Sequence, residues 1–357
     1  METKTQTKTV VVDIHIPQLL NNRLFNREEA LGIHHTLEPL LHFFDLAKQS
    51  GYQLVTPDVY LKTPQGFPGA VLISHLTSSF TPKVIAAGAV PLLLWCQESP
   101  FIATGFYLKF RAISKQFNRA LVFPGMKRQL YGKTAFVPGY FPVPYEVKNF
   151  SPLPFAEKKF ACLVSGAKFQ SNALKTMLLK LLYGFSVRNI NILRAEIVET
   201  GSHYEGFDLF GVGWDKAGIK AVTPEAVRRR YRGSLPAGGK FEVTAKYKFN
   251  FCPENSVFPG YVTEKIFDAF AAGSVPVYKG APDIEHYVPK NCFVDIRDFK
   301  DLTELFLYLS TMPESVYNNY INNIRFFLAS PQFKLFTQGY FSNQLLAVLN
   351  QHFHGQS

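Results

Sequence analysis

The chain has 357 residues, of which 47% are hydrophobic and 18% charged, a balance typical of a globular protein and not of a disordered one. Its length is sufficient for two domains of ordinary size, each with its own core. The formal net charge is +11, so we expect an anionic partner, which is either a nucleic acid or membrane surface or an anionic small molecule.

The first residues do not predict a signal peptide. METKTQTKTVVVDIHI lacks an apolar signal region, and Val10–Ile16 predicts a first strand. No apolar run approaches the roughly 20 residues that cross a membrane. The four cysteines contain no C-x-x-C pair, and each lies in or beside a predicted strand, which is typical of buried free thiols; they are Cys96, Cys162, Cys252 and Cys292. We therefore expect a cytoplasmic protein, with peripheral attachment to the inner face of the membrane as a second possibility.

The first half of the chain predicts alternating helices and strands. Residues 23–50 have a helical pattern that Gly51 stops. Short strands are predicted at Gln53–Val55 and Ala70–Ser74. The passage KVIAAGAVPLLLWCQESP then predicts a helix and the buried strand Pro91–Cys96. Three histidines (His34, His35 and His42) lie on or near this helix, but their neighbours make no convincing metal site, so we interpret them as structural or surface residues.

A carboxylate, Glu98, follows directly after the buried strand Pro91–Cys96. In a parallel sheet this is the edge where ligands bind, so Glu98 either caps a turn or acts on a ligand. The same order of helix, glycine and strand returns in the second half as AFAAGSVPVYKGAP. The repetition indicates either two ordinary glycine-stopped helices or two Rossmann-like layers, and the chain length favours the second.

Between the halves, residues 137–154 hold five prolines and predict an extended linker. The second half opens with the predicted strand KKFACLVSGAKF and a helix at Asn172–Leu182. Near the end of the chain we expect a strand at Cys292–Ile296 and helices at Asp301–Leu309, Ser315–Leu328 and Leu335–Phe353.

The stretch Lys246–Gly280 carries the strongest chemical pattern. Tyr247, Phe249 and Phe251 alternate as in a strand, and a turn-prone segment follows. Thr263 is a plausible N-cap for a short helix, after which a second buried strand is predicted. Polar side chains therefore gather between the carboxyl end of a strand and a helix N-terminus, the place where open α/β sheets bind ligands.

This block, ENS…YVTEKIFDAFAAGSVPVYKGAP preceded by YKFNF, closely resembles the signature of the family-10 α-1,3/4-fucosyltransferases over roughly residues 241–299. Many members have Asp before the Tyr-Val-Thr-Glu-Lys core, where this chain has Gly260, as some bacterial members do. The resemblance implies an α/β protein of the GT-B class, with two Rossmann-like domains facing each other across a cleft. We expect an acceptor domain at 1–150, a GDP-sugar domain at 151–330, and a C-terminal helix in 331–357 that crosses back to the first domain.

The resemblance also implies roles for particular residues. Glu98 lies in the Glu-Ser-Pro of the acceptor domain, whose Glu is the family's proposed catalytic base. The implied donor-binding residues are Glu254, Asn255, Ser256, Tyr261, Thr263, Glu264 and Lys265. A helix N-terminus carries about half a positive charge, so with Lys265 it suits a diphosphate, while Glu264 suits ribose hydroxyls. Ser171-Asn172 stand where the family's pyrophosphate-binding arginine is expected, and Lys168 is the substitute that we predict.

The function implied is inverting transfer of L-fucose from GDP-fucose to a glycan, of an N-acetyllactosamine type and with an α-1,3 linkage favoured. The partners would be the GDP-sugar and an oligosaccharide or glycolipid acceptor. No Asp-x-Asp occurs in the chain, so we expect no required cofactor and at most stimulation by a divalent metal. The alternatives are a related transferase that uses another GDP-sugar, a non-catalytic glycan-binding relative, and a basic nucleic-acid-binding protein.

The densest basic cluster consists of four arginines, Arg228, Arg229, Arg230 and Arg232. The Gly-rich segment PAGGK follows it. No nucleic-acid-binding motif accompanies it. The cluster fits a solvated helix face, a loop over a phosphate, or a patch that meets anionic lipid, and we do not expect nucleic-acid binding.

Overall fold

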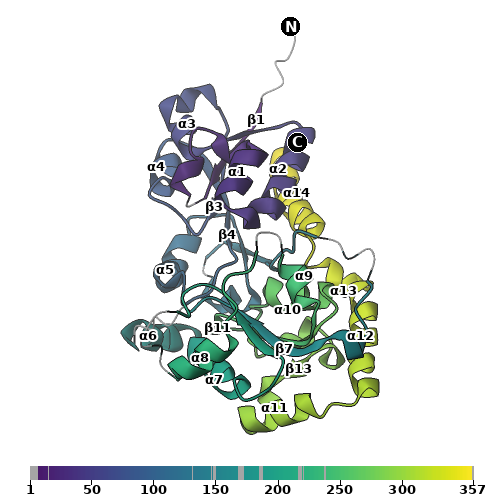
Figure 1. The fold of residues 1–357 in the computed structure, drawn as a ribbon. Coiled ribbons are helices and arrows are strands. Elements are labelled where there is room, and N and C mark those ends of the chain that lie inside the picture. Colours follow the sequence, from purple (N-terminus) through teal and green to yellow (C-terminus); the bar gives the residue numbers. More distant parts are fainter. Residues whose placement is uncertain are drawn as a thin grey trace. The chain divides into compact units, whose positions relative to one another are not determined.

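The computed structural model describes residues 7–14, 16–130, 132–145, 147, 150–167, 173–184, 188–215, 219, 221–236 and 239–355. They form two compact units (Figure 1). The first combines Met1–Tyr145 with Lys334–Ser357, and the second is Glu146–Phe333. Each unit has an α/β fold around a parallel sheet of its own.

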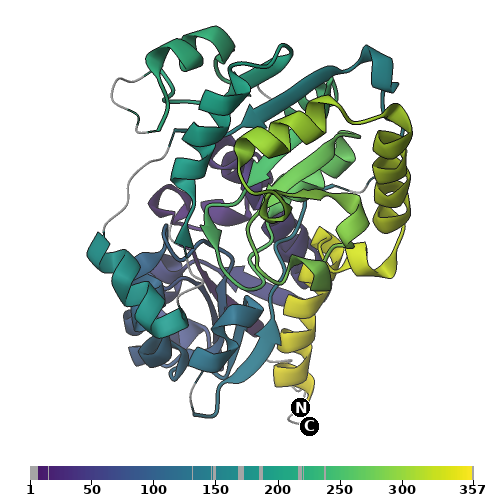
Figure 2. The ribbon, with the colours of Figure 1, turned by 90° about the horizontal axis from the view of Figure 1, so that it is seen from below.

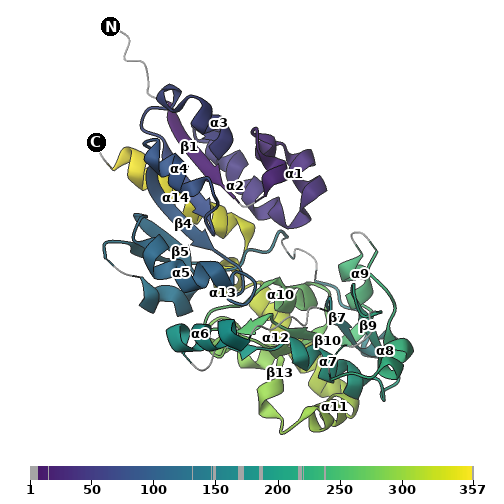
Figure 3. The ribbon, with the colours of Figure 1, turned by 90° about the vertical axis from the view of Figure 1, so that its left-hand side faces the viewer.

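The first unit contains a six-stranded parallel sheet in the order β2-β1-β3-β4-β5-β6. The strands are β1 (Lys8–Asp13), β2 (Tyr52–Val55), β3 (Val71–His75), β4 (Val90–Cys96), β5 (Arg119–Val122) and β6 (Ala135–Pro138). The helices are α1 (Arg27–Ile33), α2 (Glu38–Gln49), α3 (Pro57–Lys62), α4 (Thr81–Ala86), α5 (Thr104–Ser114) and α14 (Gln338–His354). Figure 3 shows helices on both faces of this sheet, which is why its central strands are largely buried and mostly apolar.

Helix α14 completes the core of the first unit although it comes from the other end of the chain. It lies beside α2, where Phe341, Leu345 and Leu349 join the buried cluster that includes Val10. At its far end, the Nζ atom of Lys8 lies 2.9 Å from Nε2 of His354. Figure 2 accordingly shows the first strand and the last helix ending near each other.

The second unit contains a five-stranded parallel sheet in the order β13-β12-β10-β7-β9. The strands are β7 (Lys159–Val164), β9 (Phe207–Phe210), β10 (Tyr247–Pro253), β12 (Val275–Lys279) and β13 (Val294–Asp295). The helices are α6 (Ala173–Tyr183), α7 (Asn191–Gly201), α8 (Pro224–Arg230), α9 (Lys240–Thr244), α10 (Glu264–Ala271), α11 (Leu302–Ser310), α12 (Glu314–Leu328) and α13 (Pro331–Lys334). A separate antiparallel pair joins β8 (Arg188–Asn189) to β11 (Ser256–Val257).

Strand β10 confirms the alternation that predicted it. On one face the ring of Phe251 stacks on Phe306 of α11, with ring centroids 5.0 Å apart. On the opposite face, Sγ of Cys252 lies 3.3 Å from the carbonyl oxygen of Lys265 in α10. The period of two therefore places α10 and α11 on opposite sides of the sheet.

Three segments differ from the sequence prediction. Val137 and Pro138 pair with β5 as part of β6, so the predicted linker begins too early. The helical pattern of residues 23–50 divides into α1 and α2, because α1 ends at Ile33 and a short 3-10 turn follows. The strand expected at Cys292–Ile296 is reduced to Val294–Asp295.

Candidate functional site

The order of the strands in the second unit locates a binding edge. From β7 the chain moves to β9 on one side and then to β10 on the other, so the strand order reverses between β7 and β10. Ligands bind at the carboxyl ends of strands at such a reversal. A small pocket lies there, lined by Val164, Ser165, Lys240, Asn250, Phe251, Cys252, Pro253 and Lys265.

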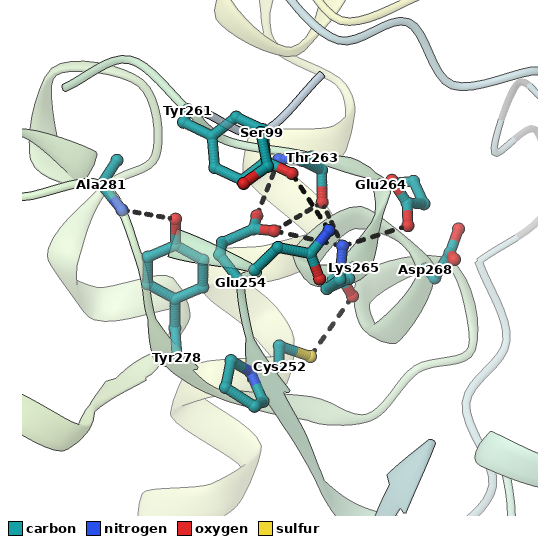
Figure 4. Close-up of polar contacts among 12 residues, drawn as sticks. Ser99, Cys252, Glu254, Tyr261, Thr263, Glu264, Lys265, Asp268, Tyr278 and Ala281 are labelled. Carbon is teal, nitrogen blue, oxygen red and sulfur yellow. Dashed lines mark hydrogen bonds and ion pairs between the residues drawn. The ribbon is translucent and has the colours of Figure 1, made fainter. Parts of the chain in front are cut away.

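Lys265 enters this edge from the first turn of α10. Its Nζ atom lies 3.2 Å from Oε2 of Glu254 and 3.3 Å from Oε1 of Glu264, and it donates a hydrogen bond to Oγ1 of Thr263 (2.8 Å) (Figure 4). Burial alone would lower the pKa of Lys265, but the two carboxylates hold it above its usual value. The structure thus fixes a charged ammonium group at the start of the helix.

Glu254 is the buried partner in this cluster. Its side chain is fully inaccessible, and burial raises the pKa of its carboxyl group. It accepts hydrogen bonds from the backbone N–H (2.8 Å) and the hydroxyl (2.7 Å) of Thr263. Because the carboxylate is saturated by Thr263 and Lys265, we infer that Glu254 positions these residues and does not contact a ligand itself.

Thr263 stands at the predicted N-cap of α10, but its side chain does not cap the helix. The hydroxyl is bound to Glu254 instead of to the N–H groups of the first turn. Those N–H groups receive no bond from the capping residue, which is the arrangement that favours an anion at a helix N-terminus. The interpretation of Thr263 as a cap is therefore correct in position and wrong in bonding.

Arg194 of α7 is a second cation at this edge, and the sequence reasoning missed it. Its Nη2 atom donates to the carbonyl oxygens of Pro253 and Glu254 (3.1 Å each) and to Oδ1 of Asn255 (2.8 Å). It is 3% exposed, and burial lowers its pKa. Its Nε atom is buried and has no hydrogen-bond partner within the described residues.

The remaining predicted donor residues lie around the same loop. Nδ2 of Asn255 lies 3.4 Å from the hydroxyl oxygen of Tyr261, which is almost fully buried. Ser256 is buried in β11. The structure thus brings together seven of the eight predicted donor residues, while Lys168 lies outside the described part of the chain.

In the first unit, Glu98 lies where the sequence predicts, just beyond the carboxyl end of β4. It lines a cavity of about 440 Å³. Its Oε1 atom accepts a hydrogen bond from the backbone N–H of Ser99 (2.6 Å). The cavity is bounded by Ile14, Ile16, His34, Thr36, Leu37, Pro39, Leu40, His75, Leu76, Trp95, Gln97, Glu98, Phe141, Pro142 and Phe341.

This cavity also follows the topology of its sheet. The strand order reverses between β1 and β3, and the cavity lies beyond the carboxyl ends of β1, β3 and β4. Two other carboxylates of the first unit, Glu38 and Asp58, do not line it. Glu38 pairs with Arg27, and Asp58 accepts hydrogen bonds from Asn21 and Thr56.

The basic cluster of α8 is largely engaged in local contacts. Arg228 and Arg229 pair with the exposed Glu225. Arg230 donates to the carbonyl oxygen of Ser202, and Arg232 pairs with Asp208. The cluster therefore resembles a solvated helix face more than a binding patch.

Within the residues that the structure describes, no group of three or more His, Cys, Asp or Glu side chains is arranged to hold a metal ion. Over the same residues, no helix combines the length and hydropathy of a membrane-crossing segment.

Residues 194–338 match the model of the C-terminal part of glycosyltransferase family 10 (fucosyltransferase). This segment of the chain is thus similar to the C-terminal part of family-10 fucosyltransferases.

Curated relatives are similar to this chain over a short segment. It is 41% identical over 70 residues to the alpha-(1,3)-fucosyltransferase FucT of Helicobacter pylori, which covers 20% of this chain and 15% of that protein. It is 39% identical over 83 residues to the mouse (Mus musculus) 4-galactosyl-N-acetylglucosaminide 3-alpha-L-fucosyltransferase 9, covering 22% and 23% of the two proteins. The similar segment thus spans less than a quarter of either relative.

Solved structures extend the likeness to the whole fold. A crystal structure of an alpha1,3-fucosyltransferase aligns with a TM-score of 0.51 at 15% identity, over 98% of this chain and 92% of the other. A DNA-modifying beta-glucosyltransferase aligns with a TM-score of 0.53 at 9% identity, over 96% and 99%. At these identities the likeness concerns the fold alone, and it confirms the expected α/β class, GT-B, with two Rossmann-like sheets.

Proposed function

We propose that this protein is a family-10 fucosyltransferase, which transfers L-fucose from GDP-fucose to a hydroxyl group of a glycan with inversion at the anomeric carbon. The observation that supports this most is the fixed ammonium group of Lys265 at the start of α10, between two carboxylates and inside the segment similar to fucosyltransferases. A cation beside a helix N-terminus stabilises an anionic diphosphate group.

The leaving group in this reaction is GDP, whose diphosphate gains negative charge as the bond to fucose breaks. Lys265 and the N–H groups of α10 would stabilise that charge, and Arg194, which donates to the carbonyl oxygens of Pro253 and Glu254 in the same loop, would be a second cation at the site. Preorganised charges of this kind act without reorganisation during the reaction. In this proposal neither Lys168 nor a divalent metal is required, so activity should persist in a metal chelator.

The proposal assigns the other donor contacts to three residues. The Glu264 side chain is 33% exposed, so its carboxylate is accessible to the ribose hydroxyls. Asn255, which accepts a hydrogen bond from Arg194 and lies 3.4 Å from the hydroxyl oxygen of Tyr261, would together with Tyr261 contact the base or fucose.

For the acceptor, the proposal assigns Glu98 as general base in the cavity of the first unit. An acceptor hydroxyl is a weak nucleophile and must lose its proton as it attacks. We take an N-acetyllactosamine-type oligosaccharide or glycolipid as the acceptor and an α-1,3 linkage as the product. The four buried free thiols suit a reducing compartment, and we propose that the reaction takes place in the cytoplasm.

The test is a thermal-stability screen with GDP, GDP-fucose, GDP-mannose, UDP and CMP. A ligand at 100 times its dissociation constant adds about 2.7 kcal/mol to the free energy of unfolding. We expect stabilisation by GDP and GDP-fucose alone. Stabilisation by GDP-mannose but not GDP-fucose would favour another GDP-sugar, and stabilisation by UDP alone would contradict the donor.

Binding without turnover would instead favour the non-catalytic alternative. It is distinguished by incubating GDP-fucose with N-acetyllactosamine and measuring both released GDP and fucosylated product. Release of GDP with formation of the product supports the transferase, whereas binding of GDP-fucose with neither result would contradict it.

A further inference from the structure

Helix α6 exposes a continuous apolar face. Leu174, Met177 and Leu181 are 60%, 52% and 65% exposed, and Leu182 is 43% exposed. At 3.6 residues per turn these four side chains and Leu178 occupy one arc of about 140° around the helix. Five adjacent apolar positions without a polar interruption are unusual on a solvated helix.

The opposite side of α6 is firmly packed. Leu179 is fully buried, and the ring of Tyr183 contacts Phe258 edge-on, with ring centroids 5.6 Å apart. The exposed face is therefore held in one orientation by the second unit. Figure 1 shows α6 at the edge of that unit.

The two charged residues of α6 are both positive. By the same helical geometry, Lys175 and Lys180 lie at the two borders of the apolar arc. From Lys158 to Ala195 the chain contains seven basic residues and no acidic one. Basic side chains on both borders of an apolar face favour an anionic, apolar surface as the partner.

We propose that α6 docks on an anionic phospholipid bilayer, with its apolar face among the upper acyl chains and its two lysines at the head-group phosphates. A second copy of the chain fits less well, because an 11-residue helix is only about 16 Å long and two such faces would bring like charges together. A membrane imposes neither restriction.

The docking helix is joined to the donor loop. The chain leaves α6 and forms β8, which pairs with β11 through Asn189 and Ser256, next to Asn255. Docking at α6 would therefore bring this loop to the membrane surface. The proposal itself depends only on α6, and so it stands or fails separately from the proposed fucosyl transfer.

The experiment is co-sedimentation of the full chain with phosphatidylcholine vesicles that contain or lack phosphatidylglycerol. We expect binding to the anionic vesicles that weakens as salt is raised. The triple variant Leu174→Ser/Met177→Ser/Leu181→Ser should bind these vesicles at least about tenfold more weakly than the wild type. The double variant Lys175→Gln/Lys180→Gln should lose most of the preference for anionic lipid, at about fivefold per lysine.

Phe326→Ser is the matched control, since Phe326 is a 74% exposed apolar side chain on α12, away from α6. It should bind vesicles like the wild type. All of these substitutions are at exposed positions, and circular dichroism and thermal midpoints verify that each variant is folded. The proposal would be overturned if the wild-type protein stayed in the supernatant with both kinds of vesicle. It would also be overturned if the triple variant bound the vesicles as strongly as the wild type does. A wild-type dimer that the triple variant converts to a monomer, measured by light scattering, would overturn it in favour of a contact between copies.

Discussion

The Nζ atom of Lys265 lies 3.2 Å from Oε2 of Glu254, a carboxylate that solvent does not reach. The cation that we assign to the diphosphate is therefore paired with a buried anion. Glu254 fixes the position of the ammonium group, and its negative charge also weakens the attraction of that group for a bound diphosphate. Substitutions of Lys265 and Glu254 should therefore change the free energy of unfolding and the affinity for GDP to different extents.

Lys265→Ala should weaken GDP binding and also destabilise the fold. Removing one partner of a buried ion pair typically costs about 3–5 kcal/mol. We expect about 2–3 kcal/mol in urea denaturation, since Lys265 is partly exposed and Thr263 still donates two hydrogen bonds to Glu254.

The double variant Lys265→Ala/Glu254→Gln separates the two effects. It removes the unpaired Glu254 carboxylate that the single variant leaves buried, so part of the lost stability should return while GDP affinity, measured by calorimetry, stays low. Recovery of GDP affinity in the double variant would contradict the assignment of Lys265 to the donor.

Arg194→Lys should lower GDP affinity by about tenfold or more. Lysine retains the charge but cannot reproduce the planar guanidinium group, whose Nη2 reaches two carbonyl oxygens and Asn255 while Nη1 reaches Asn191. Arg230→Lys is the control, because Arg230 also binds a backbone carbonyl, that of Ser202, and lies outside the loop. Equal GDP affinities in the two variants would exclude a special role for Arg194.

Glu98→Gln should reduce fucosyl transfer by about 10²–10⁴-fold, the usual contribution of a general base. GDP binding should be unchanged, because Glu98 belongs to the first unit and the donor residues to the second. Transfer to N-acetyllactosamine and GDP affinity are measured on the same preparations. Glu38→Gln serves as the control, since Glu38 does not line the cavity. Loss of both activities in Glu98→Gln would assign Glu98 a structural role, and loss of neither would place the base elsewhere.

Lys158 should give the protein a stability that increases in alkaline solution. It is 6% exposed and its Nζ atom donates to the carbonyl oxygen of Gly273 (2.6 Å). Burial lowers its pKa from 10.5 to about 8. Between these values the unfolded chain carries the proton and the folded chain does not, so raising the pH favours folding.

Lys158→Met removes this group and tests the sign. The wild-type minus variant difference in unfolding free energy should grow by up to about 3 kcal/mol from pH 7.5 to pH 10. Taking the difference between the two proteins removes the contribution of the tyrosines, because these titrate in both of them. A difference that is the same at both pH values would show that Lys158 keeps its ordinary pKa in the folded state.

The sequence predicted the β10–α10–β12 unit because its signals are local. The aromatic alternation marks the strand, and Gly273 ends the helix with a φ of 65°, a conformation that favours glycine. Gly88 has the same role after α4, with a φ of 102°. The resemblance between the two halves therefore reflects a true structural repeat of helix, glycine and strand.

The parts that the sequence did not predict depend on contacts between distant segments. Arg194 reaches Asn255 across 61 positions, and nothing near Arg194 in the sequence indicates that contact. The cavity beside Glu98 includes Phe341 from α14, at the other end of the chain. The hydroxyl of Thr263 turns to Glu254 because a buried carboxylate binds it more strongly than a backbone N–H does.

The return of α14 to the first unit also affects how the protein can be made. Residues 146–333 must all be synthesised before α14 can supply Phe341 and Leu349 to the core begun by β1. At about 5–20 residues per second this interval is on the order of ten to forty seconds. The second unit can complete its sheet on the ribosome during that time, while the first waits with an open apolar face on α2. We therefore expect the nascent first unit to bind chaperones. The unit whose synthesis begins first should be the last to complete its folding.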